Sequence, residues 1–292
     1  MAFEIGYTDQ AGATGYAHKE MLLKIKALAE ANGWITLRYD TSDAASHELI
    51  LQGEGLSGED EIFIGVRTYE NVDADYYNLA VAGFTGYVPG NVWSAQPGFM
   101  ESGVPAHNQR CDYWLAVNAQ RIFLGLKVGT PVYETAYVGF FLPFATPGQY
   151  PYPLCVIGML DGADDVRYSD TAHSMGFKGD PAGATSRPNC RFRWLDGTWK
   201  SPEMFPWNNA TLAGGSGSTA RQLRDTDSQY PVMRVIACDS TPNIYGTLDG
   251  VGYVSNFNNT VESTIGIDGT DWLCLQDVGR TSFTDYIAVR MD

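Results

Sequence analysis

Positive charge is scarce in this chain. Its 292 residues contain 19 lysines and arginines against 34 aspartates and glutamates, which gives a formal net charge of -15. Affinity for nucleic acid comes chiefly from Lys and Arg side chains that displace counterions from phosphates. The composition therefore argues against sequence-specific binding of nucleic acid. A negative wall could still stand beside DNA, because it repels a duplex and lets it slide past.

Cysteine and histidine are also sparse. Five cysteines lie far apart with no CxxC pair, and four histidines show no metal-ligand spacing: Cys111, Cys155, Cys190, Cys238, Cys274, His18, His47, His107 and His173. We expect reduced thiols buried as small apolar groups, no metal and no cofactor. His107, beside Arg110 in GVPAHNQR, is interpreted as a hydrogen-bonded loop residue.

Long apolar runs are absent. The first residues, MAFEIGYTDQ, have neither the basic nor the apolar region of a signal peptide, and no run reaches the length of a membrane helix. We expect a soluble protein made in the cytoplasm, with no membrane partner.

A single helix is predicted, over residues 17–32. Its apolar positions fall on one stripe: Met21, Leu22, Ile25, Leu28 and Ala29. Asn32 and Gly33 provide a stop signal, and Thr14 is a candidate N-terminal cap.

Strand-like runs dominate the rest of the chain. RIFLGLKVG, AYVGFFLPF and PLCVIGML are rich in β-branched and aromatic residues and are separated by proline-rich connectors. Proline cannot donate a backbone hydrogen bond, so four prolines should bound strands: Pro143, Pro147, Pro151 and Pro153. Asn118 and Ala119 are a plausible turn. The fold class expected is α+β and mostly β, with the N-terminal helix packed on an antiparallel sheet and a β-rich second subdomain after it.

The sequence changes character near residue 160. From there shorter strands alternate with Gly, Asp, Asn and Pro, and four Asp-Gly pairs each predict a tight turn: Asp161-Gly162, Asp196-Gly197, Asp249-Gly250 and Asp268-Gly269. Residues 213–220 resemble a linker. We therefore expect subdomains at 1–160 and 161–292.

Two sequence patterns that could indicate ligand binding lack the surrounding residues that such sites need. Gly53, Gly55 and Gly58 match GxGxxG, but three carboxylates and another strand follow them where a dinucleotide site needs a helix. A hairpin loop is the better interpretation. The acidic clusters lack the spacing of a calcium loop.

Aromatic residues gather in one stretch, residues 191–207. They form the candidate interface together with Arg110, Tyr150 and Tyr152, and they are Phe192, Trp194, Trp199, Phe205 and Trp207. Trp, Tyr and Arg are enriched where proteins meet. The same aromatic hairpin could instead serve as a platform for sugars.

Four stretches of the chain are distinctive: ELILQGEGLSGEDEIFIGVRTY, AVAGFTGY, the segment from GVPAHNQRCDYW to PGQYPYP, and the C-terminal DWLCLQDVGRTSFTDYIAVRMD. Together they resemble a structural protein family of tailed bacteriophages. The resemblance covers residues 34–160 and 245–292, and residues 161–244 match it less clearly. It implies a virion component of the neck, collar or tail.

This resemblance also implies a self-assembling protein. We expect a closed ring of roughly six or twelve copies around the DNA passage, in contact with neighbouring neck or tail proteins. No catalytic residues follow from the resemblance, and we expect neither polysaccharide hydrolysis nor nuclease activity. The alternatives are a baseplate adaptor, and a carbohydrate-binding or carbohydrate-cleaving tail module that uses the aromatic hairpin with carboxylates such as Asp161 and Asp165.

Overall fold

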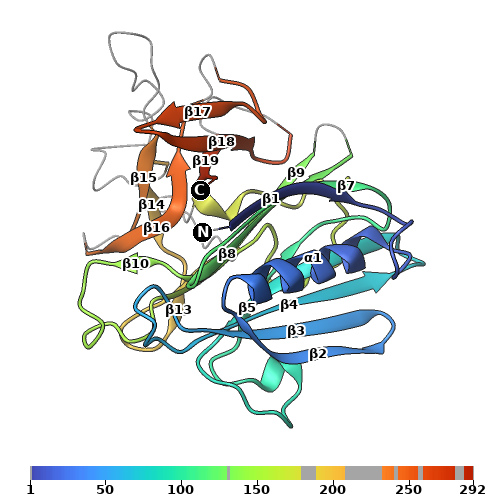
Figure 1. The fold of residues 1–292 in the computed structure, drawn as a ribbon, viewed down its shortest axis with the longest axis horizontal. Helices are drawn as coiled ribbons and strands as arrows, with labels where there is room; N and C mark the ends of the chain where they lie inside the picture. The colour runs from blue at the N-terminus through green and yellow to red at the C-terminus, as the bar shows by residue number, and fades with distance from the viewer. Residues whose placement is uncertain are drawn as a thin grey trace.

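The computed structural model describes residues 2–129, 132–178, 189–207, 232–239, 243–255, 259–279 and 286–291. Within these ranges the chain is mostly β, with one N-terminal α-helix packed on antiparallel sheets (Figure 1). This confirms the fold class expected from the sequence. Residues 213–220, predicted as a linker, lie outside the described residues.

The first sheet is the middle layer of the molecule. Its strands run in the order β1-β7-β8-β9-β11-β12-β13, and each neighbouring pair is antiparallel. The bounds are β1 (Ala2–Thr8), β7 (Cys111–Val117), β8 (Arg121–Val128), β9 (Tyr133–Phe140), β11 (Leu154–Ile157), β12 (Cys190–Arg193) and β13 (Trp199–Lys200). The three apolar runs singled out in the sequence supply β8, β9 and β11, as expected.

The second sheet is an antiparallel meander in the order β2-β3-β4-β5-β6. Its bounds are β2 (Ile35–Asp43), β3 (Ser46–Gly53), β4 (Ile62–Asn71), β5 (Tyr76–Phe84) and β6 (Met100–Val104), with a 3-10 turn η1 (Trp93–Ala95) before β6. The glycine-rich residues 53–58 lie in the hairpin connection from β3 to β4, as predicted, and a strand follows them where a dinucleotide site would need a helix.

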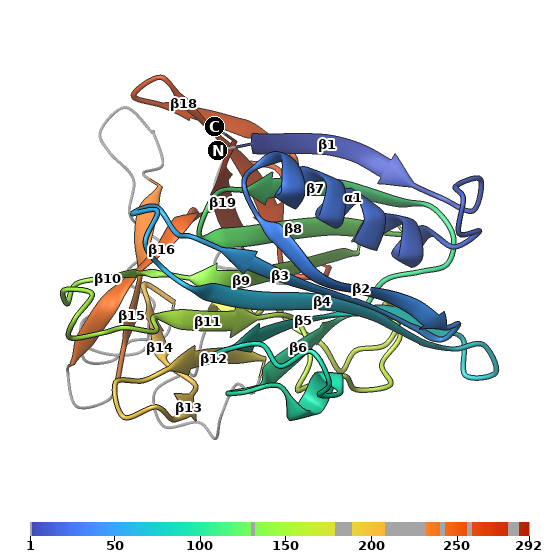
Figure 2. The same cartoon turned by 60° about the horizontal axis from the view of Figure 1, so that its bottom comes forward.

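The third sheet runs in the order β14-β15-β16-β19-β18-β17, and β10 also pairs with β16. Its bounds are β10 (Leu142–Pro143), β14 (Glu203–Phe205), β15 (Met233–Cys238), β16 (Ile244–Tyr253), β17 (Thr264–Ile267), β18 (Thr270–Gln276) and β19 (Tyr286–Arg290), and a 3-10 turn η2 (Gly176–Lys178) precedes them all except β10. The first sheet lies between the other two (Figures 1 and 2).

Strands β8 and β9 are covered on both faces. Every residue of β9 is buried, and in β8 only Lys127 is not. Runs without alternation are typical of strands with two buried faces. The second sheet covers one face through contacts of β4 and β5 with β9. The third sheet approaches the other, where a Cβ on Gly125 would lie 2.7 Å from Leu275 Cδ1.

Helix α1 (Ala17–Ala31) packs between the edge of the first sheet and the second sheet. Met21, Leu22 and Ile25 on its apolar stripe are buried, and the helix ends before Asn32 and a left-handed Gly33, as predicted.

Thr14 does not cap this helix, so that prediction is wrong. The N-cap is Tyr16, which makes no side-chain cap hydrogen bond. The first two helical N–H groups instead donate to the backbone carbonyls of Asn108 and His107, at 3.0 and 3.2 Å. A loop distant in the sequence thus supplies the acceptors that a local side chain usually provides.

Two of the four Asp-Gly pairs form the hairpins predicted. Asp268 and Gly269 have φ angles of 51° and 81° and join β17 to β18 as a two-residue turn. Asp196 and Gly197 lie in the loop between β12 and β13. That loop has three residues where two are expected, since it closes by a hydrogen bond from Trp194 N to Thr198 O.

The other two pairs do not form hairpins. Asp249 and Gly250 lie within β16, so a tight turn there is wrong. Asp161 and Gly162 lie in a loop after β11, where Gly162 bridges Ser102 in parallel.

The prolines and cysteines follow expectation. Pro143 ends β10 and Pro153 directly precedes β11, while Pro147 and Pro151 lie in the connector between these strands. All five cysteines are buried free thiols. The turn predicted at Asn118 joins β7 to β8.

The subdomain boundary predicted at residue 160 does not separate the sheets from one another. β12 and β13, which follow it, continue the first sheet, and β10, which precedes it, pairs with the third. Each of these sheets therefore takes strands from both sides of the predicted boundary.

Candidate interaction surfaces

Three aromatic residues of the predicted interface are part of the core. Phe192, Trp194 and Trp207 are 0%, 5% and 5% exposed. The ring of Phe192 lies 4.8 Å from that of Phe141, and Trp194 stacks on Tyr245 at 4.0 Å. Packing inside the chain thus removes most of the hairpin's aromatic face from the surface, and an open sugar platform on Trp194 and Trp207 is not present.

The remaining aromatic candidates are anchored within the chain. Tyr150 is buried and its hydroxyl donates to the backbone carbonyl of Arg193 at 2.5 Å. Trp199 is half-buried, and its Nε1 donates to a backbone carbonyl of the connection between β5 and β6 at 3.0 Å. Tyr152 and Phe205 are half-buried. These side chains mainly pack within the chain, and little of their surface is open to a partner.

Arg110 is far more exposed. Its guanidinium lies 4.1 Å from the ring centroid of Tyr7 and 2.8 Å from the carboxylate of Asp112. Tyr7 and the nearby Ile5 are exposed on β1, the edge strand of the first sheet. Edge strands with exposed apolar side chains are surfaces where further chains can attach.

An apolar surface surrounds the tip of the aromatic hairpin. Phe144, Leu195 and Ile244, which we call the tip patch, are 61%, 57% and 44% exposed. They come from the segment after β10, the hairpin loop and the start of β16, and Phe144 N donates to Tyr245 O at 2.9 Å. A cavity of about 620 Å³ lies here, lined by Ala145, Tyr150, Leu195, Asn243, Ile244 and Tyr245.

Sequence reasoning missed the tip patch. One signal for it existed, because Leu195 directly precedes the Asp196-Gly197 turn, where a hairpin loop usually carries polar residues. The contributions of Phe144 and Ile244 had no such signal, since the fold alone brings their segments together.

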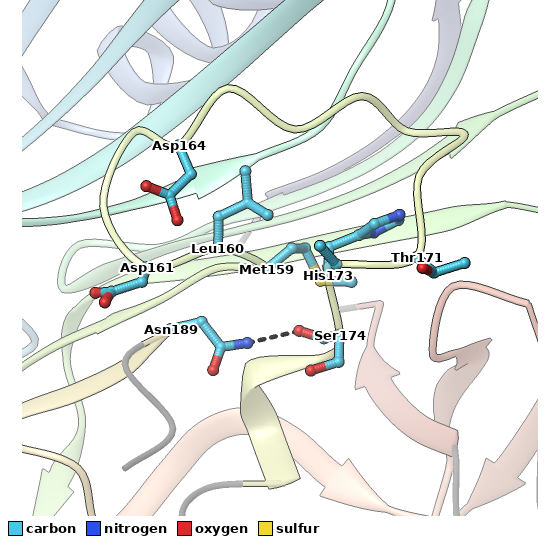
Figure 3. A pocket seen from close by; sticks show the side chains of 9 residues that line it. Met159, Leu160, Asp161, Asp164, Thr171, His173, Ser174 and Asn189 are labelled. Atoms are coloured by element: carbon cyan, nitrogen blue, oxygen red, sulfur yellow. Dashed lines mark hydrogen bonds between the residues drawn. The ribbon is translucent and has the colours of Figure 1, made fainter. Parts of the chain in front are cut away.

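A polar pocket opens after β11 (Figure 3). Its volume is about 290 Å³, and the lining residues are Met159, Leu160, Asp161, Asp164, Thr171, Ala172, His173, Ser174 and Asn189. Burial and the neighbouring carboxylates of Asp161 and Asp165 raise the pKa of Asp164. Asn189 Nδ2 donates to Ser174 O at 2.6 Å and holds one wall (Figure 3).

His173 cannot serve this pocket as a free base. Its Nδ1 lies 3.2 Å from Oε2 of Glu134, and its Nε2 lies 2.8 Å from the carbonyl of Asp170. A carbonyl only accepts, so Nε2 carries a proton, and Nδ1 shares another with Glu134. Both nitrogens are engaged, which leaves no imidazole lone pair for a nucleophile such as Ser174.

Asp161 and Asp165, the carboxylates considered for sugar cleavage, are both exposed. Asp161 lies 4.0 Å from Arg191. Neither lies in the kind of enclosed apolar setting that surrounds the general acid of a glycosidase.

His107 is a hydrogen-bonded loop residue, as predicted. Its Nδ1 accepts a 2.9 Å hydrogen bond from Gln109 N, and its ring lies between Tyr77 and Tyr168, with centroids 6.0 and 5.0 Å away. Together with its carbonyl bond to His18 N, this ties the loop to the start of α1.

Two features are absent from the residues that the structure describes. No group of three or more His, Cys, Asp or Glu side chains there could hold a metal ion. No helix in that part of the chain is long and apolar enough to cross a membrane.

No protein-family model matches the chain, and no curated protein matches it.

Proposed function

We propose that this protein is a non-enzymatic structural subunit of a tailed-phage virion, which assembles into a ring of the neck, collar or tail around the DNA passage. Its partners are further copies of itself and neighbouring virion proteins. The tip patch is the observation that carries the proposal. Three large apolar side chains from three segments are exposed to water, two of them, Leu195 and Ile244, line a cavity, and such patches usually mark contact sites.

The charge of the chain supports a place beside DNA. A net charge of -15 opposes adhesion to a phosphate backbone, which suits a wall past which DNA must move. In this proposal the apolar side chains of the tip patch form the contact between subunits, and acidic side chains face the DNA passage.

The ring requires the tip patch as one half of its subunit contact. Leu195→Asp combined with Ile244→Asp should abolish assembly, because it places two carboxylates in a contact that excludes water. Leu56→Asp is the matched control, since Leu56 is 60% exposed on a loop of the second sheet. Mass photometry of the purified chain should show roughly six or twelve copies for the wild type and the control, and monomers for the double variant.

The intact particle is the deciding sample. Electron microscopy and mass spectrometry of purified virions should show the protein as a ring in the neck or tail. A protein that is absent from particles, or present there with no contact between its copies, would contradict the proposal. The same holds if the double variant assembles as well as the wild type.

A further inference from the structure

A second cavity lies on the third sheet, away from the tip patch. Its volume is about 330 Å³, near the lower end of the range for small-molecule sites. Six strands contribute to it, β10, β15, β16, β17, β18 and β19, together with neighbouring loop residues. The lining residues include Arg234, Thr247, Gly252, Asp268, Trp272 and Arg290. We call it the sheet groove.

Glycine makes this groove possible. Gly252 of β16 pairs with Arg234 of β15 on one side and with Ala288 of β19 on the other. Paired residues point to the same face of a sheet, so two small residues separate Arg234 from the larger side chains of β18. A Cβ at Gly252 would lie 2.4 Å from Val232 Cγ1 and would narrow the groove.

An aromatic ring forms one wall. Trp272 of β18 is half-buried, and its Cζ3 lies 3.7 Å from the position that a Cβ on Gly252 would take. The indole therefore reaches across β19 and over the glycine. Asp268, in the turn between β17 and β18, is exposed at the same side of the groove.

Arg234 forms the opposite wall, because β16 and β19 separate its strand, β15, from β18, whereas Arg290 is the cross-strand neighbour of Trp272. Arg234 is exposed, and it makes no ion pair within the described ranges. Arg290 lies 3.9 Å from Asp249, whose carboxylate is also bound by Asn118 and Gln120.

We propose that the sheet groove binds a saccharide that carries a carboxylate, such as a uronic acid unit. The apolar face of a sugar ring stacks on the indole of Trp272. The guanidinium of Arg234 pairs with the sugar carboxylate, for which its planar fork is suited. Thr247 and Asp268 provide oxygens that accept hydrogen bonds from sugar hydroxyls.

The composition of the groove favours this ligand over other anions. A nucleic acid or polyphosphate presents many charges to a chain of net charge -15 and is repelled. A single carboxylate on a ring needs one guanidinium and one aromatic face, and Arg234 and Trp272 supply both in the groove. This proposal does not rest on the virion role, because it concerns the isolated chain.

Two sugars that differ in a single group test the proposal. We expect the purified chain to bind methyl glucuronide saturably in an NMR titration, and to bind methyl glucoside, its neutral counterpart, at least about 10-fold more weakly. Arg234→Ala should weaken glucuronide binding by about 10-fold or more. Arg234→Lys should recover only part of that loss, since an ammonium cannot pair in a bidentate manner.

The indole and the control complete the design. Trp272→Phe should weaken the binding of both sugars, because the phenyl ring offers a smaller stacking face than the indole. The chain should stay folded, as measured by circular dichroism, since an aromatic ring still fills the position. Arg167→Ala is the matched control, since Arg167 is another exposed arginine, paired with Asp170, and should leave binding unchanged.

Four outcomes would overturn the assignment. They are no saturation by methyl glucuronide, equal binding of methyl glucoside, equal binding of propionate, which has a carboxylate but no ring, and unchanged binding in Arg234→Ala. If the chain assembles into its oligomeric ring but does not bind the sugar, the proposed virion role still stands. Failure of one proposal is therefore distinguishable from failure of the other.

Discussion

The side-chain amide of Asn118 donates a 2.5 Å hydrogen bond to the carboxylate of Asp249 and so ties the turn between β7 and β8 to β16. Gln120 Nε2 donates to the same carboxylate oxygen at 3.1 Å. Arg121, which is fully buried, brings its Nε within 3.7 Å of it. One carboxylate thus joins the first and third sheets and compensates a buried guanidinium.

Removal of this carboxylate should destabilise the protein strongly. Asp249→Ala leaves the charge of Arg121 buried without its counterion, and we expect the free energy of unfolding to fall by about 3–5 kcal/mol. Asp271→Ala is the control, because Asp271 is exposed on β18, and it should change that free energy by less than about 0.5 kcal/mol. Urea unfolding measures both, and a loss below about 1 kcal/mol for Asp249→Ala would contradict the role given to the pair.

Alanine substitutions at Gly250 and Gly269 distinguish the cost of backbone strain from the cost of a steric clash. Gly250 and Gly269 have φ angles of 67° and 81°, so an alanine at either is strained by about 1 kcal/mol. A Cβ at Gly250 would lie 2.2 Å from Nη2 of Arg121, whereas one at Gly269 meets nothing within 4 Å. Gly250→Ala should therefore cost about 1–3 kcal/mol more than Gly269→Ala in thermal or urea unfolding. Equal losses of unfolding free energy in the two variants would contradict this prediction and would show that the guanidinium of Arg121 moves aside freely.

The pair of His173 and Glu134 should make stability fall as pH rises. Burial raises the pKa of Glu134 to about 7, against the hydrogen bond from His173 that lowers it. Burial alone would lower the pKa of His173, but the hydrogen bond and charge of Glu134 outweigh it and raise that pKa. Both groups then hold protons more tightly in the folded chain than in the unfolded one.

The sign of the effect follows from proton linkage. A state that binds more protons loses stability as pH increases, so the contribution of the pair is full below about pH 4.5 and is lost as pH rises through about 7 and above the ordinary histidine value. Glu134→Gln should make the slope of the unfolding free energy between about pH 5 and 8 less negative, as measured by urea unfolding at several pH values. Glu59→Gln, in an exposed loop, should keep the wild-type slope. An unchanged slope in Glu134→Gln would refute the assignment.

Local features were predictable where neighbours in the sequence decide them. The stripe of Met21, Leu22 and Ile25 predicts α1, and the Asp268-Gly269 pair predicts its hairpin, because helix periodicity and positive φ angles depend on residues close in the chain. Pro143 and Pro153 bound strands for a similar reason, since proline lacks the N–H of a ladder hydrogen bond.

The same signals mislead where a distant segment intervenes. Asp249-Gly250 looks like a turn, yet Gly250 serves the close approach of Arg121 from another sheet. Thr14 has the chemistry of a cap, but carbonyls of residues 107 and 108 reach the start of α1.

The sequence by itself determined the helix, the β-rich class, the hairpins at Asp196-Gly197 and Asp268-Gly269, and the excess of negative charge, because each depends on composition or on residues a few positions apart. Tertiary structure alone decided which aromatic residues are buried and which apolar ones are exposed. Trp194 is covered because Tyr245 lies 4.0 Å away, although the two are distant in sequence. The tip patch and the sheet groove arise in the same way, from the order in which strands pair, which no single stretch of the chain encodes.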